Sequence, residues 1–283
     1  MSGGSFMYAT AGAEMRPDLK SMPNPGPAPK AKPRKSEDSA SVDLTKVADL
    51  HVLSADGKSF SFKDLYLRSS HGAASHSQTH RTLFIFVRHF FCGVCQDYLQ
   101  MLSASIKPEA LNSPPLKYPT QIIVIGCGEP SLIPWYAETT SCPYPIYADP
   151  SGQLYQALQM TKTLSLGETK PAYSPGTFVG TTLRSMKQMV MSGPSIFKGG
   201  DFKQVGGELL IEVGSGAATH TDIAEPLPYK EYGSSEEEKT QTQTPHPATS
   251  GQDEQAHVVW VHRMQSTRDH TEVPELRKII GLD

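Results

Sequence analysis

Two cysteines separated by two residues are the groups in this sequence with the clearest chemistry. Cys92 and Cys95 stand in the segment FIFVRHFFCGVCQDYLQML, where an apolar run typical of a buried strand ends and helical spacing begins. Backbone N–H groups and the dipole at a helix N-terminus stabilise a thiolate, so the pKa of the Cys92 thiol should fall below about 8.5. A thiolate attacks peroxide oxygen or disulfide sulfur, and Cys95 is placed to resolve the resulting sulfenic acid or mixed disulfide. The motif therefore predicts a redox-active pair.

Three basic side chains are candidates for the same site. Arg88 and His89 directly precede the motif, where the arginine can add positive charge and the histidine can act as a proton shuttle. Arg263, at the end of the last predicted strand, can stabilise a thiolate or a peroxide oxygen through a charge-assisted hydrogen bond. A surface salt bridge with Asp269 or Glu272 explains Arg263 equally well, so both interpretations stay open.

The pair itself also has two interpretations without redox chemistry. A CxxC motif is half of a zinc site, but Cys127 and Cys142 are 15 residues apart in separate segments, and no second CxxC or HxxxH follows. Two inert cysteines can also line the start of a helix. The redox interpretation is favoured because a strand precedes the motif and a helix follows it. No metal and no bound cofactor is expected.

The remaining cysteines and a histidine-rich segment are weaker candidates. Cys127 follows a predicted strand at its carboxyl end, where α/β sheets place their sites, so it either reaches the CxxC pair or is a small packed residue. Cys142 lies in a predicted loop and could act as a second resolving thiol, although its spacing does not demand it. His71, His76 and His80 lie in a Gly/Ser-rich segment without a carboxylate, which favours a solvated loop over a metal site.

Strand-type and helix-type runs alternate around the motif. Apolar runs predict buried strands over 82–87 and 121–126, and a short strand over 145–148. Helical spacing follows each of them, over 94–105, 131–139 and 152–160. This order predicts an α/β sheet with parallel strands and right-handed crossovers.

Shorter elements flank this parallel part. Two short strands meet at Asp56-Gly57, strand-type runs over 208–213 and 257–261 can pair antiparallel, and a final helix starts with Thr271 as its N-cap. A parallel half, a β-hairpin and a last helix form the order of a thioredoxin-like domain. The predicted fold class is therefore α/β, thioredoxin-like, with a central mixed β-sheet flanked by helices.

Composition limits the number of domains and the classes of partner. Residues 1–41 form a Pro/Lys-rich tail and about 214–256 an acidic insertion, both predicted to be disordered, which leaves one domain over 42–283. A net charge of -3 gives no basic footprint for nucleic acid, and no apolar run is long enough for a membrane. Without an apolar leader, and with only four cysteines, the chain is expected to be cytoplasmic with reduced thiols.

Four separated segments carry a family resemblance. RHFFCGVCQDYL, GCGEPSLIPWYAETTSCPYPIYADPSGQLYQALQM, GGDFKQVGGELLIEV and WVHRMQSTRDHTEVPELRKIIGL resemble the AhpC/TSA-like antioxidant enzyme domain proteins, in the peroxiredoxin-like 2 group of the type common among fungi. The resemblance implies a thioredoxin-like fold, with thiol-dependent antioxidant or reductase chemistry at Cys92 and Cys95. A peroxide or disulfide is then the expected substrate, and an external dithiol such as thioredoxin or glutathione the expected reductant.

The segments differ from typical members at two places. His89 stands three residues before Cys92, where a typical peroxiredoxin has Thr or Ser, and no proline precedes the strand that follows Gly206 and Gly207. These glycines either allow close approach of a substrate backbone or form a turn. Two further functions therefore stay open, namely reduction of a specific organic endoperoxide or metabolite, and a non-catalytic interaction module with a thioredoxin fold.

Overall fold

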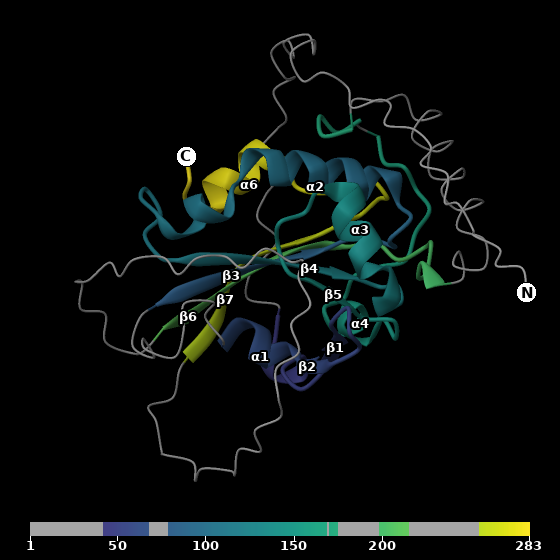
Figure 1. Cartoon of the computed structure of the whole chain (residues 1–283), viewed down its shortest axis with the longest axis horizontal. Helices are drawn as coiled ribbons and strands as arrows, with labels where there is room; N and C mark the ends of the chain where they lie inside the picture. The colour runs from purple at the N-terminus through teal and green to yellow at the C-terminus, as the bar shows by residue number, and fades with distance from the viewer. Residues whose placement is uncertain (1–41, 68–78, 169, 175–197, 215–254) are drawn as a thin grey trace, which may run out of the picture. The chain divides into compact units, whose positions relative to one another are not determined.

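Seven strands of the described part form one mixed sheet between two layers of helices (Figure 1). The computed structural model describes residues 42–67, 79–168, 170–174, 198–214 and 255–283. The predicted tail, nearly all of the predicted insertion, and His71 and His76 lie outside the described residues, so the predictions made for them stay predictions.

The strands are β1 His51–Leu53, β2 Ser59–Ser61, β3 His80–Phe86, β4 Thr120–Gly126, β5 Ile146–Ala148, β6 Gly207–Gly214 and β7 Gln255–Arg263. They lie in the order β2-β1-β5-β4-β3-β6-β7 across the sheet. β3, β4 and β5 are parallel neighbours, and the other adjacent pairs are antiparallel. This parallel half, followed by the β6–β7 pair and a last helix, confirms the predicted α/β fold of thioredoxin-like class.

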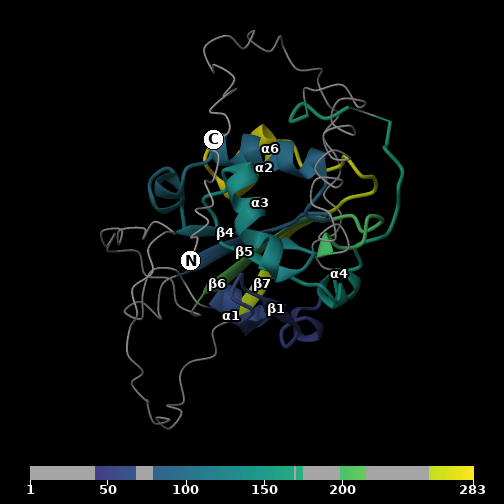
Figure 2. The ribbon, with the colours of Figure 1, turned by 45° about the vertical axis from the view of Figure 1, so that its right-hand side comes forward.

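The helices are α1 Phe62–Leu67, α2 Gly93–Ser105, α3 Ile133–Thr140, α4 Gln153–Ala157 and α6 Val273–Ile280. Short 3-10 turns occur at Leu44–Lys46, Pro108–Asn112 and Pro130–Leu132. α2, α3 and α6 cover one face of the sheet, and α1 and α4 cover the other (Figures 1 and 2). Among the described residues there is no helix with the length and apolar character needed to cross a membrane.

β3 shows how one apolar run builds a core on both sides of the sheet. Leu83 and Ile85 pack in the cluster beneath α2, whereas Phe84 and Phe86 pack in the cluster with α1 and α4. Successive side chains of a strand point to opposite faces, and all four are fully buried. The run is continuous because β3 lies between β4 and β6 and is covered on both faces.

The start of the last helix differs from the prediction. α6 begins at Val273 with Glu272 as its N-cap residue, so the predicted N-cap at Thr271 is wrong. Thr271 lies one residue before the N-cap, where its hydroxyl and its backbone N–H both donate to the buried Glu208 Oε2, at 3.0 and 3.5 Å. The predicted end of the helix is confirmed, since Gly281 is the C-cap with a φ of 93°.

Candidate active site

The chain leaves β3 and enters α2 through a short turn that makes Cys92 the N-cap of the helix. The Cys92 N–H donates to the His89 carbonyl at 2.9 Å, and the Gln96 N–H donates to the Cys92 carbonyl at 3.0 Å. The Gln96 side chain closes the turn by donating to the Phe90 carbonyl at 3.0 Å. Cys95 lies in the first turn of the helix. Both thiols are free, with Cys92 4% exposed and Cys95 0% exposed.

Arg88 is the cation at this turn. Its Nη1 donates to Cys92 Sγ at 3.3 Å, while its Nε and Nη2 donate to the carbonyls of Gln204 and Phe202 at 3.2 and 2.6 Å. These two carbonyls fix the planar guanidinium against the sulfur. Hydrogen bonding from the Cys95 thiol, together with the charge of Arg88, outweighs burial and holds the pKa of Cys92 well below its usual value. The site therefore favours the thiolate of Cys92 more strongly than water does.

Cys95 has the opposite preference. Burial, followed by the neighbouring Cys92 sulfur, raises the pKa of the Cys95 thiol well above its usual value. Its Sγ lies 3.4 Å from His270 Nε2. The pair at rest is thus one thiolate and one thiol, which suits a nucleophile and a resolving group.

His89 lies in an apolar environment next to this turn. Its ring meets the Phe202 ring edge to face, with centroids 4.5 Å apart, and its Nδ1 has no hydrogen-bond partner among the described residues. Burial lowers the pKa of His89 to about 4. The imidazole is therefore neutral at pH 7, so it can relay a proton but adds no positive charge.

Arg263 lies on the other face of the sheet from the cysteines. It pairs with Gly207 across β6 and β7, and its Nε donates to the Leu158 carbonyl at 2.7 Å in the core beside α4. The side chain is buried and is not part of the surface. The structure thus brings Arg88 to Cys92 but does not bring Arg263 to the cysteine pair.

Neither of the other cysteines has the environment of a reactive thiol. Cys127 packs in the cluster with α1 and α4, opposite the pair, and its Sγ donates to the Asp201 carbonyl at 3.9 Å. Cys142 Sγ donates to the Tyr144 carbonyl at 3.8 Å. Burial raises the pKa of both thiols to about 12, so both stay protonated at neutral pH. The geometry favours the interpretation of Cys127 as a packed residue.

The glycines before β6 are closed off by the protein's own backbone. A Cβ on Gly206 would lie 1.7 Å from the Phe86 carbonyl oxygen, and one on Gly207 would lie 2.2 Å from the His262 carbonyl oxygen. Glycine therefore allows β6 to approach β3 and β7 at this end of the sheet. The space that a substrate backbone would need at these two Cα atoms is taken.

A buried polar network, whose residues lie far apart in the sequence, also reaches the site. Glu208 is 0% exposed, and its Oε1 and Oε2 lie 2.6 Å from His270 Nδ1 and 2.7 Å from His262 Nδ1. Thr271 Oγ1 donates to the same carboxylate, and His262 Nε2 lies 3.7 Å from Asp269 Oδ2. The signal in the sequence was a glutamate at the start of the apolar run ELLIEV.

The charges of this network balance one another. Burial alone would raise the pKa of Glu208, but hydrogen bonds from His262 and His270 outweigh it and hold that pKa below its usual value. Burial likewise opposes charge on His262, yet Asp269 and Glu208 raise its pKa to about 9. At pH 7 an ionised Glu208 is therefore paired with a protonated His262.

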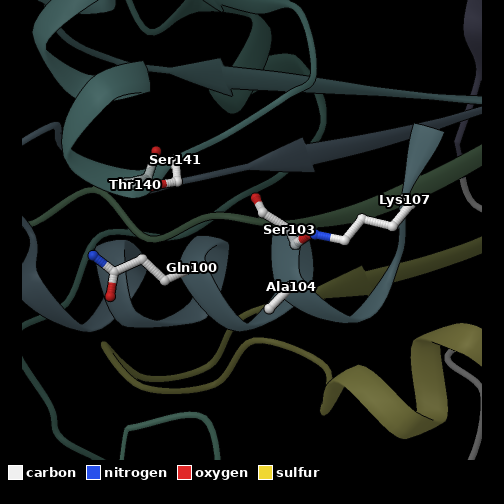
Figure 3. A pocket seen from close by; sticks show the side chains of 6 residues that line it. All are labelled: Gln100, Ser103, Ala104, Lys107, Thr140 and Ser141. Atoms are coloured by element: carbon white, nitrogen blue, oxygen red, sulfur yellow. The ribbon is translucent and has the colours of Figure 1, made fainter. Parts of the chain in front are cut away.

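A pocket of about 240 Å³ lies further along α2 (Figure 3). It is lined from α2, from the turn after it and from the end of α3 by Gln100, Ser103, Ala104, Lys107, Thr140 and Ser141. Ser103 is about 16 Å along the helix axis from Cys92 at the usual rise per residue. The pocket is therefore separate from the cysteine site.

The described residues also contain no group of three or more His, Cys, Asp or Glu side chains placed to hold a metal ion.

Comparison with known proteins gives a family for this chain. A model of the AhpC/TSA antioxidant enzyme family matches residues 102–222. Peroxiredoxin-like 2C of Takifugu rubripes is 32% identical over 184 residues, which cover 63% of this chain and 73% of that protein. Peroxiredoxin-like 2C of Homo sapiens is 27% identical, over 63% of this chain and 72% of that protein. The type common among fungi stays a prediction.

Similar solved structures include thiol oxidoreductases. A disulfide oxidoreductase secreted by Mycobacterium tuberculosis has a TM-score of 0.27 and 10% identity, covering 40% of this chain and 69% of that chain. A peroxiredoxin Q structure from Xanthomonas campestris has a TM-score of 0.29 and 11% identity, covering 62% of this chain and 80% of that chain.

Proposed function

Because the chain belongs to the AhpC/TSA family, in its peroxiredoxin-like 2 group, we propose that it is a thiol-dependent antioxidant oxidoreductase with Cys92 as nucleophile and Cys95 as resolving thiol. The family supports a general thiol redox role. The observation that carries the assignment to these residues is the hydrogen bond from Arg88 Nη1 to Cys92 Sγ, 3.3 Å long and buried. A cation held against the first sulfur of a strand-to-helix turn favours the form of that sulfur that reacts.

The first step is attack of the Cys92 thiolate on one oxygen of a peroxide. A sulfur–oxygen bond forms, the oxygen–oxygen bond breaks, and the leaving oxygen departs as an alcohol or water after taking up a proton. His89 is the proposed relay for that proton, since its neutral imidazole lies at the turn with an unpartnered Nδ1. Arg88 remains beside the sulfur throughout this step.

The second step converts the sulfenic acid of Cys92 to a disulfide with Cys95. Cys95 attacks the Cys92 sulfenic acid, the sulfur–sulfur bond forms, and the hydroxyl leaves as water. An external dithiol such as thioredoxin or glutathione then reduces the disulfide by thiol exchange. The reducing cytoplasm is the compartment that supplies such a reductant. Arg263 takes no part in this scheme, because its Nε is engaged by the Leu158 carbonyl on the other face of the sheet.

The surroundings of Cys92 favour a small organic peroxide over a disulfide in a folded protein. Cys92 is only 4% exposed, so a bulky partner has little access to its sulfur. Aromatic rings lie close to the turn, with Phe91 packed on Trp135 at a centroid distance of 5.1 Å. Reduction of a specific organic endoperoxide or metabolite is therefore the second candidate function.

The test is turnover by the full chain of hydrogen peroxide and of cumene hydroperoxide, with NADPH consumption coupled through thioredoxin or glutathione. Cys92→Ser should abolish turnover. Cys95→Ser should oxidise once and accumulate a sulfenic acid that dimedone traps. Cys142→Ser is the matched control and should turn over like the natural chain, because burial raises the pKa of the Cys142 thiol to about 12 and so keeps it protonated.

Three results separate the alternatives. Absence of a Cys92–Cys95 bridge after peroxide, with a Cys92 pKa of about 8.5 or above by alkylation, would contradict the enzyme and favour an interaction module. A bridge without peroxide turnover would favour a disulfide reductase. Turnover restricted to one organic endoperoxide would favour the second candidate.

A further inference from the structure

The resolving step requires the thiolate form of Cys95, which the surroundings of that residue disfavour. Sulfur attacks sulfur as a thiolate, but Cys95 is fully buried, and burial beside Cys92 raises its thiol pKa well above the usual value. A base in hydrogen-bond reach is therefore needed to take its proton. His270 Nε2 lies at 3.4 Å from Cys95 Sγ, close to that position.

The hydrogen bonds of His270 set which of its nitrogens can act as a base. A neutral imidazole carries hydrogen on one nitrogen and a lone pair on the other, and an ionised carboxylate only accepts. Glu208 Oε1 lies 2.6 Å from His270 Nδ1, so the hydrogen belongs on Nδ1. The lone pair is then on Nε2, which faces the Cys95 thiol. This is the arrangement of nucleophile, base and orienting carboxylate that activates thiols in other folds.

The ring of His270 is held by contacts with two aromatic rings and a carboxylate. Tyr98, in α2 one turn after Cys95, stacks on it with centroids 4.3 Å apart and an interplanar angle of 4°, and the Tyr173 ring lies edge-on with a centroid distance of 6.3 Å. The backbone N–H of His270 also donates to Tyr173 Oη at 3.0 Å, which fixes the main chain here. The ring therefore cannot turn away from Cys95 without losing the stack on Tyr98 and the contact between Nδ1 and Glu208.

Glu208 keeps its charge in the interior because a second histidine supports it. His262 Nδ1 lies 2.7 Å from Oε2, and the side chains of His262 and Asp269 are 13% and 14% exposed. The network thus leads from the buried thiol towards solvent. Its titratable groups facing His270 are Cys95 and Tyr98 from α2, Tyr173, and Glu208 from β6, with His262, Asp269 and Glu272 beyond them.

We propose that His270 is the catalytic base that takes the proton from Cys95 in the resolving step, and that Glu208 is the residue that positions it; this rests on the proposed function. The proton passes from the Cys95 thiol to His270 Nε2, and the thiolate attacks the Cys92 sulfur. The sulfur–sulfur bond forms, the sulfur–oxygen bond breaks, and the departing hydroxide takes the proton back from His270 as water. His270 ends neutral, and peroxide is the oxidant of the whole sequence.

The experiment times the two chemical steps separately in the full chain. Sulfenic acid formation at Cys92 is followed in a Cys95→Ser background, and disulfide formation is followed by quenched flow and mass spectrometry after a pulse of peroxide. His270→Asn should leave the first step unchanged and slow disulfide formation by about 100- to 10,000-fold, the usual contribution of a general base. His80→Asn is the matched control, because His80 is buried against the Tyr66 carbonyl, away from this network.

The pH profile distinguishes a base from a structural residue. In His270→Asn the rate of disulfide formation should rise about tenfold per pH unit, because it follows the rare thiolate of Cys95. The natural chain should depend on pH much less. Glu208→Gln should show the same steep profile, because an amide can donate to Nδ1 and so turn Nε2 into a donor. If His270→Asn does not fold, Glu208→Gln provides the same test.

Two results overturn the proposal. One is disulfide formation in both variants at the natural rate and with the natural pH profile. The other is found by titrating the Cys95 thiol in two chains that both carry Cys92→Ser, one with His270 and one with His270→Asn. The proposal predicts that the ultraviolet absorbance of the Cys95 thiolate appears at lower pH in the chain with His270. Superimposed titrations would refute the base even if Cys92 never reacts with peroxide, so failure of the proposed function remains distinguishable.

Discussion

Replacement of Arg88 by glutamine is the most direct test of how the site activates Cys92. The change removes the positive charge and keeps an amide N–H near the position of the arginine Nε, which donates to the Gln204 carbonyl. If the thiolate depends on this cation, the pKa of Cys92 must rise. Cys92 should then react with alkylating agents and peroxide only at higher pH.

The size of the change follows from the distance between the charges. At 3.3 Å, two unit charges attract by about 1 kcal/mol at the dielectric constant of water and by about 5 kcal/mol at an effective value of about 20. The guanidinium spreads its charge, and hydrogen bonding from Cys95 remains in the variant, so the lower half of this range applies. One pKa unit corresponds to about 1.4 kcal/mol, so the pKa of Cys92 should rise by about 1 to 2 units.

The assay is the rate of iodoacetamide labelling of the Cys92 peptide as a function of pH, read by mass spectrometry. Arg88→Lys keeps the charge without the planar fork and should give a smaller rise than Arg88→Gln. Arg277→Gln, which removes an arginine paired with Asp283 at the far end of the fold, should leave the profile of Cys92 unchanged. Coincident profiles for the natural chain and Arg88→Gln would refute the assignment of Arg88 as the activating cation.

Three further outcomes are expected. Gly206→Ala should lower the free energy of unfolding in urea by about 3 kcal/mol or more, because the new Cβ meets the Phe86 carbonyl, whereas Gly57→Ala, in open space with a φ of 79°, should cost about 1 kcal/mol. The free energy of unfolding should decrease as the pH is lowered below about 4.5, because Glu208, whose pKa is lowered, becomes protonated. It should also decrease as the pH is raised from 6.5 to about 9, because His262, whose pKa is raised, loses its proton. Glu208→Gln should reduce both of these decreases. Cys127 and Cys142, whose thiol pKa values are about 12, should stay unlabelled by iodoacetamide under conditions that label Cys92, and comparable labelling would contradict their packing.

The parts of the site that the sequence predicted are those encoded locally. The run TLFIFV is apolar without interruption because β3 is central and covered on both faces, and helical spacing starts directly after it. That change of period alone places Cys92 at a helix start. Arg88 is four residues before Cys92, so its contact with the sulfur also belongs to the same turn.

The parts that the sequence did not predict depend on strand register. Glu208 lies opposite Ile85 because β6 pairs antiparallel with β3, and only this register puts its carboxylate under α2. His270 meets Cys95 from 175 residues away. Thr271, read locally, is a good N-cap, but the helix begins one residue later, and both the hydroxyl and the backbone N–H of Thr271 donate to Glu208. This contact depends on the tertiary fold and could not be read from the local sequence.

Glu208 is difficult to explain by stability alone. An ionised carboxylate loses several kcal/mol of solvation in the interior, and a well-packed apolar group in such a place is often as stable or more so. Its strand neighbours Leu209 and Leu210 show that the sheet accepts apolar side chains there. An apolar side chain could not, however, keep hydrogen on His270 Nδ1 and a lone pair towards Cys95. The buried carboxylate is therefore explained by its role in positioning His270 beside Cys95. Arg88 acts on the other thiol, Cys92, from the turn that precedes α2. Burial and the hydrogen bond between the two sulfurs give these thiols opposite protonation preferences within one helical turn, and each sulfur also has its own partner in the fold, Arg88 for Cys92 and His270 for Cys95.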